Sequence, residues 1–477
     1  MPLISSSNVH LLFAMKSLKS LFLLTGLLLT SSGYSQILTV HEWGTFTTLS
    51  GSDGGTLSGL YYEEEQLPGF VYHHTGFSPD PSVFVNGYRP CKHVTVKMET
   101  PVLYFYSEIE RDVTVKVDFP NGTISQWYPE RSGGETDPVG DIDLSIAQTG
   151  SIEWDATVLA LNTTKQFTHQ AVIQKWEEPR QTDANLIENH KGEVEKYLFY
   201  RGLANVELPV EVKFGAGDGN LELTVSNKGA LDIPFIYIYD HSESHQVRIW
   251  GIGPLPAGAS KIFTKPTKYY ASWEENIDEY PAFATALVNA GLTEKEALAM
   301  LRTWTSGYFQ TMGFKVFWIV PRELTDAVLP IQITPNPDLL ERVLVGKSEI
   351  LTPELEARLV ADYLAGTFEN NWKQHHYYLA FKQRMEQLVP AKVESELLEN
   401  TSVFPNPVGN TLFIRGTDSQ EAIHCSLRNI LGEVVGYSIL PVTAGVAQLN
   451  VSHLPTGIYI LHAIQNGQIK AMRIIKD

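Results

Sequence analysis

Apolar and polar residues alternate in short runs over the first half of the chain, and this period of two is typical of half-buried strands. The run His41–Leu49 opens the pattern. Asn121-Gly122 separates two later runs and is a strong signal for a tight hairpin turn. We therefore expect residues 36–269 to form a β-rich region, with an immunoglobulin-like sandwich near 205–265.

The hydrophobic period changes after residue 270. Thr293 and Glu296 have the spacing of a capping box, which marks a helix start. Apolar residues then recur at helical spacing from Ala297 to Tyr308. Short strand patterns alternate with further helical patterns beyond this point. The sequence predicts an α/β or α+β segment over 270–390, so that the whole chain is multidomain and mainly β.

The N-terminus has the pattern of an export signal. Two lysines precede the apolar run Leu21–Leu29, and small and polar residues follow it as far as Ser35. This order predicts a secretory signal peptide over residues 1–35, cut before Gln36. The apolar run is too short for a stable membrane span, and the mature protein is expected to have no transmembrane segment. Met15 is a candidate start, because the residues before it add nothing to the signal pattern.

A linker over 391–402 leads to a C-terminal region of short alternating strands, 403–477, which predicts a small β-sandwich. The region carries a set of turn and terminal residues in a fixed order: Pro405, Asn406, Pro407, Gly432, Gly457, Tyr459 and Lys476. In these residues the chain resembles the type A C-terminal sorting domain of the type IX secretion system. The resemblance implies that the general secretion machinery and then the type IX apparatus carry the protein through the periplasm. It also implies removal of the tag, followed by release or attachment at the outer cell surface.

Three segments of the body carry a second resemblance: Val40–Thr47, Glu195–Gly202 and Arg342–Pro353. They look like segments of a family of exported bacterial proteins of unknown function. That family implies no activity for the body.

The net charge of −18 changes the range of expected partners. An acidic surface repels phosphate backbones, so the composition argues against a nucleic-acid partner. Extracellular ligands such as glycans remain candidates. Aromatic residues that could stack on sugar rings are spread over the β-rich region: Trp43, Tyr61, Tyr62, Phe70, Tyr72, Trp127, Tyr128, Trp154 and Trp176.

A group of candidate metal ligands lies near the expected mature N-terminus: His41, Glu42, His73 and His74. Imidazole and carboxylate groups bind zinc and similar ions, and three such ligands with a water make a hydrolytic centre. Alternation along a strand places His41 and Glu42 on opposite faces, which weakens the grouping. A divalent metal is therefore a candidate cofactor without a recognised ligand motif.

These observations leave two hypotheses for the body. In the first, the body is a binding or surface-structural module of unknown activity. In the second, it is an extracellular metal-dependent hydrolase with a site near His41 and His73. The sequence does not decide whether the protein is an enzyme, since it contains no nucleophile elbow, phosphate loop or spaced ligand pair in a convincing context.

Overall fold

The computed structural model describes most of the chain beyond the N-terminal segment, in these ranges: 37–60, 67–74, 91–136, 142–170, 173–215, 222–243, 246–264, 269, 280–389, 401–415, 421–429, 434–465 and 468–477. The predicted signal peptide, its cut between Ser35 and Gln36, and Gly432 lie outside these ranges.

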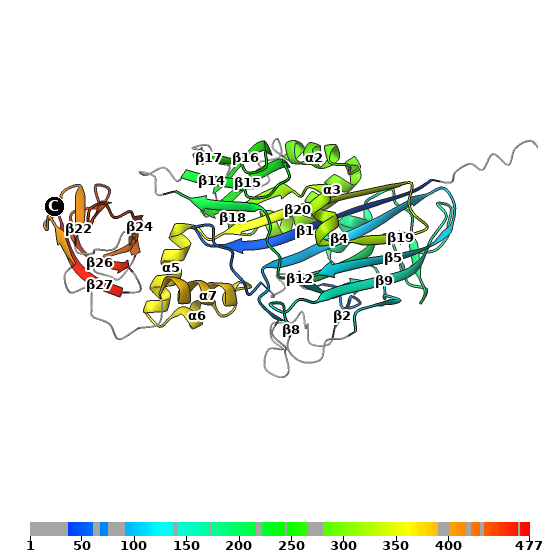
Figure 1. The fold of residues 1–477 in the computed structure, drawn as a ribbon, viewed down its shortest axis with the longest axis horizontal. Coiled ribbons are helices and arrows are strands. Elements are labelled where there is room, and N and C mark those ends of the chain that lie inside the picture. Colours follow the sequence, from blue (N-terminus) through cyan, green and yellow to red (C-terminus); the bar gives the residue numbers. More distant parts are fainter. Residues whose placement is uncertain are drawn as a thin grey trace, which may run out of the picture. The chain divides into compact units, whose positions relative to one another are not determined.

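A 15-stranded sheet forms the centre of the body (Figure 1). Its main path runs through β11 (Val194–Glu195), β10 (Ile187–Asn189), β9 (Thr149–Val158), β6 (Gly122–Tyr128), β12 (Leu198–Ala204), β4 (Val96–Ser107), β1 (Leu38–Ser50), β20 (Leu339–Ile350), β18 (Gly313–Ile319), β15 (Ile233–Glu243) and β16 (Gln246–Leu255). Off this path lie β2 (Tyr72–His73), β5 (Arg111–Pro120), β7 (Gly133–Gly134) and β19 (Ile331–Thr334). The mainly β fold predicted from the alternating pattern is confirmed.

Strand β1 occupies the middle of this sheet. It pairs with β4 in antiparallel register and with β20 in parallel register, so that Thr45 lies between Glu99 and Val345. Both β18 and β20 come from the segment 270–390, and they continue the sheet that β1 begins. The helical segment and the β-rich region therefore share one sheet.

The region near 205–265 contributes to two sheets. Strands β13 (Val210–Phe214), β14 (Glu222–Asn227) and β17 (Ser260–Thr264) form a three-stranded sheet of their own. Strands β15 and β16 instead extend the large sheet. A short parallel pair, β3 (Cys91–Lys92) with β8 (Ile142–Asp143), forms a separate two-stranded sheet.

The turn at Asn121-Gly122 is present, but the hairpin predicted from it is wrong. Asn121 has a positive φ of 57°, as a tight turn allows. However, β5 pairs with β9 and β19, whereas β6 pairs with β12. The turn's backbone groups bond elsewhere: the Asn121 amide donates to the carbonyl of Gln148, and the Asn121 carbonyl accepts from the amide of Asn205. The turn therefore connects β5 and β6 without pairing them, because each strand pairs with other strands and the turn's backbone groups bond to distant residues.

The helices are shorter elements placed mostly after residue 280: α1 (Gln174–Glu177), the 3-10 turn η2 (Glu178–Arg180), α2 (Tyr280–Asn289), α3 (Glu294–Trp304), the π-helical turn η4 (Thr305–Phe309), α4 (Arg322–Val328), α5 (Pro353–Leu364), α6 (Phe368–Trp372) and α7 (Tyr378–Leu388). The capping box at the start of α3 is confirmed. Thr293 accepts from the Glu296 amide, and the Glu296 side chain accepts from the Thr293 amide.

Alternation along β1 sends its side chains into two cores. Leu38, Val40 and Phe46 join the core on one face of the sheet. Trp43 joins the core on the other face, where α2 and α3 pack through residues such as Leu301. The helix-covered face is the one that carries the polar site described below.

Residues 401–477 form two small sheets. One contains β21 (Ser402–Phe404), β22 (Thr411–Arg415) and β25 (Val446–Asn450). The other contains β24 (Val434–Leu440), β23 (Ile423–Asn429), β26 (Gly457–Gln465) and β27 (Gln468–Lys476). Buried side chains from both sheets, including Leu412 and Leu461, make one core. The predicted C-terminal β-sandwich is confirmed.

Candidate functional site

The central strands are irregular at one row of the sheet. The register between β1 and β4 shifts between Trp43 and Thr45, and β12 has shifts on both of its edges next to Gly202. Thr100 on β4 has a φ of 55°, in the left-handed region that a β-branched residue rarely adopts. Bulges and such outliers occur often beside functional sites, where they redirect side chains.

The irregularity on β4 changes which residues face the helices. Met98 and Leu103 both belong to the core on the opposite face, although five positions separate them. As a result Glu99 and Val102 both point toward the helix-covered face. A regular strand could not place these two residues on one side, because they are three positions apart. Gly44 makes room for the bend, since a Cβ at that position would lie 2.9 Å from Cα of Pro101.

Glu99 is buried and is held by several groups. The Lys97 ammonium lies 3.1 Å from its Oε1, and the Tyr308 hydroxyl donates to its Oε2 at 3.0 Å. The Thr47 hydroxyl donates to the same carboxylate. Lys347 lies 3.7 Å from Oε2 and 3.8 Å from the centre of the Tyr308 ring. A buried carboxylate requires such compensation, because burial without it would cost several kcal/mol.

The charged network continues along β20 and β18. Lys347 also lies 2.9 Å from Glu349, and Lys315 donates to the carbonyl of Thr311 at 2.9 Å. Burial of Glu349 opposes its ionisation, but the positive charges of Lys347, Lys315 and His376 outweigh that effect. Together they lower the pKa of Glu349 to about 2. Its carboxylate is therefore ionised over the whole physiological pH range.

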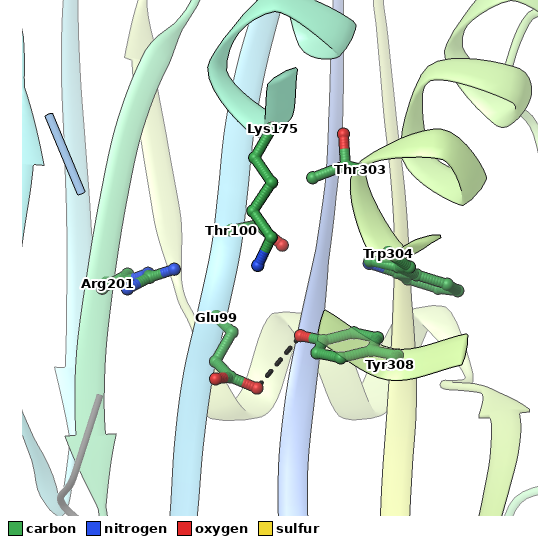
Figure 2. Close-up of a pocket in the computed structure, with 7 residues that line it drawn as sticks. All are labelled: Glu99, Thr100, Lys175, Arg201, Thr303, Trp304 and Tyr308. Atoms are coloured by element: carbon green, nitrogen blue, oxygen red, sulfur yellow. Dashed lines mark hydrogen bonds between the residues drawn. The ribbon is translucent and has the colours of Figure 1, made fainter. Parts of the chain in front are cut away.

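The helices supply the other side of the site (Figure 2). Thr303 and Trp304 end α3, and Tyr308 belongs to the π-helical turn that follows it. Lys175 reaches the same space from α1, and Arg201 from β12. π-Helical turns are rare and are frequent at functional sites. These groups enclose a cavity of about 10 Å³, enough for one water-sized group.

Each of the three body segments of the second resemblance supplies one residue in or beside this pocket. Arg201 on β12 lines the cavity, and Thr47 on β1 and Lys347 on β20 contact Glu99 on its wall. These strands lie within four neighbouring positions of the sheet. The sequence interpretation did not identify Glu99, Tyr308 or the pocket itself. The one available signal was the presence of lysine, arginine and glutamate within otherwise strand-like runs.

The predicted metal ligands His41 and Glu42 point to opposite faces of β1, as alternation predicts. On the helix-covered side, Nδ1 of His41 lies 2.9 Å from Oε2 of Glu296. The other carboxylate oxygen of Glu296, Oε1, accepts from the Tyr106 hydroxyl at 2.7 Å. On the other side, Glu42 is fully buried and lies 2.5 Å from Nε of Arg342. Both groups are used in linking elements of the fold.

His73 and His74 lie far from His41 along the sheet. They belong to or follow β2, which is four strand positions from β1, or roughly 19 Å. Nδ1 of His73 contacts the His74 carbonyl, and Nε2 of the buried His74 lies 3.4 Å from Glu135. Within the described ranges, no three His, Cys, Asp or Glu side chains come together in an arrangement able to hold a metal ion. The structure thus does not assemble His41, Glu42, His73 and His74 into one ligand set.

The aromatic residues considered for sugar stacking are mostly internal. Trp43, Tyr128 and Trp154 are fully buried, and Trp127 and Trp176 are nearly so. Phe70 stacks on His169 and packs against Tyr128 and Trp176. Tyr61 and Tyr62 lie outside the described residues. The buried rings therefore supply no platform for a glycan.

The C-terminal sandwich matches the family described as the secretion system C-terminal sorting domain, over residues 402–477. This region is a type IX secretion sorting domain. The sorting domain makes the protein a cargo of the type IX machinery and indicates export to the cell surface or secretion. In the sorting domain, the Tyr459 hydroxyl donates to the Pro455 carbonyl at 2.8 Å, which closes the turn before β26.

No curated protein matches the sequence. Among solved structures, the chain is similar to the yeast delta-COP-I mu-homology domain complexed with a Dsl1 peptide, at 9% identity and a TM-score of 0.25, over 66% of this chain and 98% of that one. It is also similar to dimeric latent PorU from Porphyromonas gingivalis, at 9% identity and a TM-score of 0.14, over 80% of this chain and 31% of that one. Both scores are too low to establish a common fold. Among the residues that the structure describes, no helix combines the length and apolar character needed to cross a bilayer.

Proposed function

We propose that the protein is an exported binding protein whose body holds a small extracellular ligand in the pocket between β4, β12 and α3. The sorting domain takes it across the outer membrane, where it is released or attached to the cell surface. The observation that carries the proposal is the convergence of charged and polar side chains on one cavity. Three separate elements, β4, β12 and the π-helical turn, depart from regular geometry to bring them there.

The energetic cost of this arrangement supports a functional role. Buried charges add little net stability compared with an apolar core of the same shape. In this protein several charged side chains are buried on the helix-covered face of the sheet, next to a core of aromatic and aliphatic side chains. Sites that bind small molecules combine such apolar walls with a few convergent polar groups.

The test compares two tyrosine variants of the full chain. Tyr308→Phe removes a hydroxyl that reaches Glu99 in the pocket. Tyr104→Phe removes a buried hydroxyl that donates to the Pro179 carbonyl outside it. The melting temperature of each variant is measured in the presence of single compounds from a panel of sugars, sugar acids, amino acids and small dicarboxylates. A ligand present at 100 times its Kd should stabilise the folded chain by about 2.7 kcal/mol.

The expected result is a ligand that raises the melting temperature of the wild type and of Tyr104→Phe, and has a smaller effect on Tyr308→Phe. Equal responses of both variants would place the ligand elsewhere. A panel without any stabilising compound would contradict the proposal for those ligand classes.

A further inference from the structure

The hydrogen-bonding inventory of the pocket indicates what kind of group it accepts. Lys175, Arg201 and Trp304 line the cavity, and their side chains can only donate hydrogen bonds. The single carboxylate on the wall, Glu99, already receives bonds from Tyr308 and Thr47. A ligand group entering the cavity therefore meets mainly donors.

The Trp304 indole and the Thr100 hydroxyl are polar groups on the wall that have no protein partner among the described residues. The indole Nε1 of Trp304 and the hydroxyl of Thr100 are buried, and neither makes a hydrogen bond in the part of the chain that the structure describes. Buried polar groups in native proteins are nearly always satisfied by protein, water or ligand. The backbone at Thr100 has an unfavourable positive φ, so the surrounding structure must hold its hydroxyl in this position.

We infer that the pocket recognises an oxyanion of its ligand, and that a carboxylate is the group it fits. This inference rests on the proposed binding function and specifies the ligand class. The guanidinium of Arg201 matches the two oxygens of a planar carboxylate, and the Trp304 indole supplies a further N–H donor. Phosphate and sulfate share this chemistry, but they are tetrahedral and bulkier than a carboxylate, and the cavity is small.

The geometry also indicates how the ligand lies. The cavity is small, with room for one water-sized group, so at most an oxygen of the acidic group enters it and the rest of the molecule extends outward. Lys175 is only half-buried, whereas Arg201 and Trp304 are 5% and 1% exposed. The ligand body is therefore expected on the Lys175 side, where the lysine can pair with the anion as it enters.

The experiment measures binding of sodium D-glucuronate and of its neutral counterpart D-glucose to the full chain by titration calorimetry, with acetate, phosphate and sulfate at the same ionic strength. Trp304→Phe removes the indole N–H and keeps an aromatic ring. Trp250→Phe is the matched control, because Trp250 also has a buried indole nitrogen with no hydrogen-bond partner among the described residues, but lies on β16, outside the pocket lining. Near-ultraviolet circular dichroism checks that both variants are folded.

We expect the wild type and Trp250→Phe to bind glucuronate and acetate, and glucose at least about tenfold more weakly. Trp304→Phe should weaken glucuronate binding about tenfold, the factor for one hydrogen bond to a charged group. Tighter binding of phosphate or sulfate would overturn the carboxylate assignment. If a neutral compound binds in a Tyr308-dependent way and no anion does, the oxyanion inference fails while the binding function stands. If neither anions nor neutral compounds bind, both fail.

Discussion

The ion pair between Glu42 and Arg342 allows a sharp test of the fold. Both side chains are fully buried, on the face of the sheet away from α3. The Tyr200 hydroxyl donates to Oε1 of Glu42, and Arg342 donates through Nη1 to the Leu329 carbonyl at 2.7 Å. Burial, together with the nearby negative charge of Glu42, raises the pKa of Tyr200 well above its usual range, so the tyrosine stays protonated and can donate.

Replacing Glu42 with glutamine keeps the size of the side chain and removes its charge. The amide oxygen can still accept from Tyr200, but the Arg342 guanidinium loses its buried counter-charge. Breaking a buried pair from one side costs about 3–5 kcal/mol. Asp326 lies 2.8 Å from Nη1 of Arg342 and is 44% exposed, so it offers partial compensation. We therefore expect a loss near the lower end, about 3 kcal/mol.

The assay is urea denaturation of the full chain, followed by tryptophan fluorescence. Glu323→Gln on α4 is the matched control, because this glutamate is exposed and should change stability by less than about 0.5 kcal/mol. A double variant, Glu42→Leu with Arg342→Met, should recover much of the loss, since an apolar pair of similar volume removes the uncompensated charge. The reasoning is refuted if Glu42→Gln and Glu323→Gln unfold at the same urea concentration.

Three further predictions concern other parts of the chain. Gly346→Ala should destabilise the body by about 1–3 kcal/mol in the same denaturation assay, because a Cβ there would lie 2.1 Å from the buried Trp318 ring. Gly409→Ala is the control and should leave stability unchanged, because a Cβ at that position meets no atom within 4 Å. Glu349→Gln should lower stability at pH 6 by on the order of 3 kcal/mol. The pKa of Glu349 is lower in the folded state than in the unfolded state. Its contribution to the free energy of unfolding is therefore present above about pH 4.5 and is lost as the pH falls toward 2. The difference in stability between variant and wild type should close over that range. Deleting residues 402–477 should keep the body in the cell fraction, and equal amounts of deleted and intact protein outside the cell would contradict its role as a type IX cargo.

Local signals in the sequence predicted the local parts of the fold. The alternating run His41–Leu49 became β1, and Thr293 with Glu296 became the capping box of α3. The period of side chains and the pairing of cap groups are short-range properties, so one sequence is enough to show them.

The parts that the sequence did not predict depend on long-range packing. The Asn121-Gly122 turn was visible, but its strands pair with β9 and β12 because of contacts with distant residues. The bulge at Thr100 reverses the facing of β4 and places Glu99 toward the helices, and strict alternation cannot show such a step. The pocket depends on the bulge at Thr100 and on the π-helical turn, and no sequence motif indicated either of them.

The parallel pairing of β1 with β20 has a consequence for how the protein reaches its folded state. Partners in this pairing are 300 positions apart, as for Thr39 and Leu339, and next to them the Leu38 amide donates to the Asp338 carboxylate at 2.8 Å. Closing a loop of that length costs about 5 kcal/mol of chain entropy before the contacts form. Topologies dominated by such distant pairings fold slowly. The middle of the sheet cannot be completed until residue 350 has been synthesised. We expect the newly made chain to stay open long enough to cross the inner membrane before it folds.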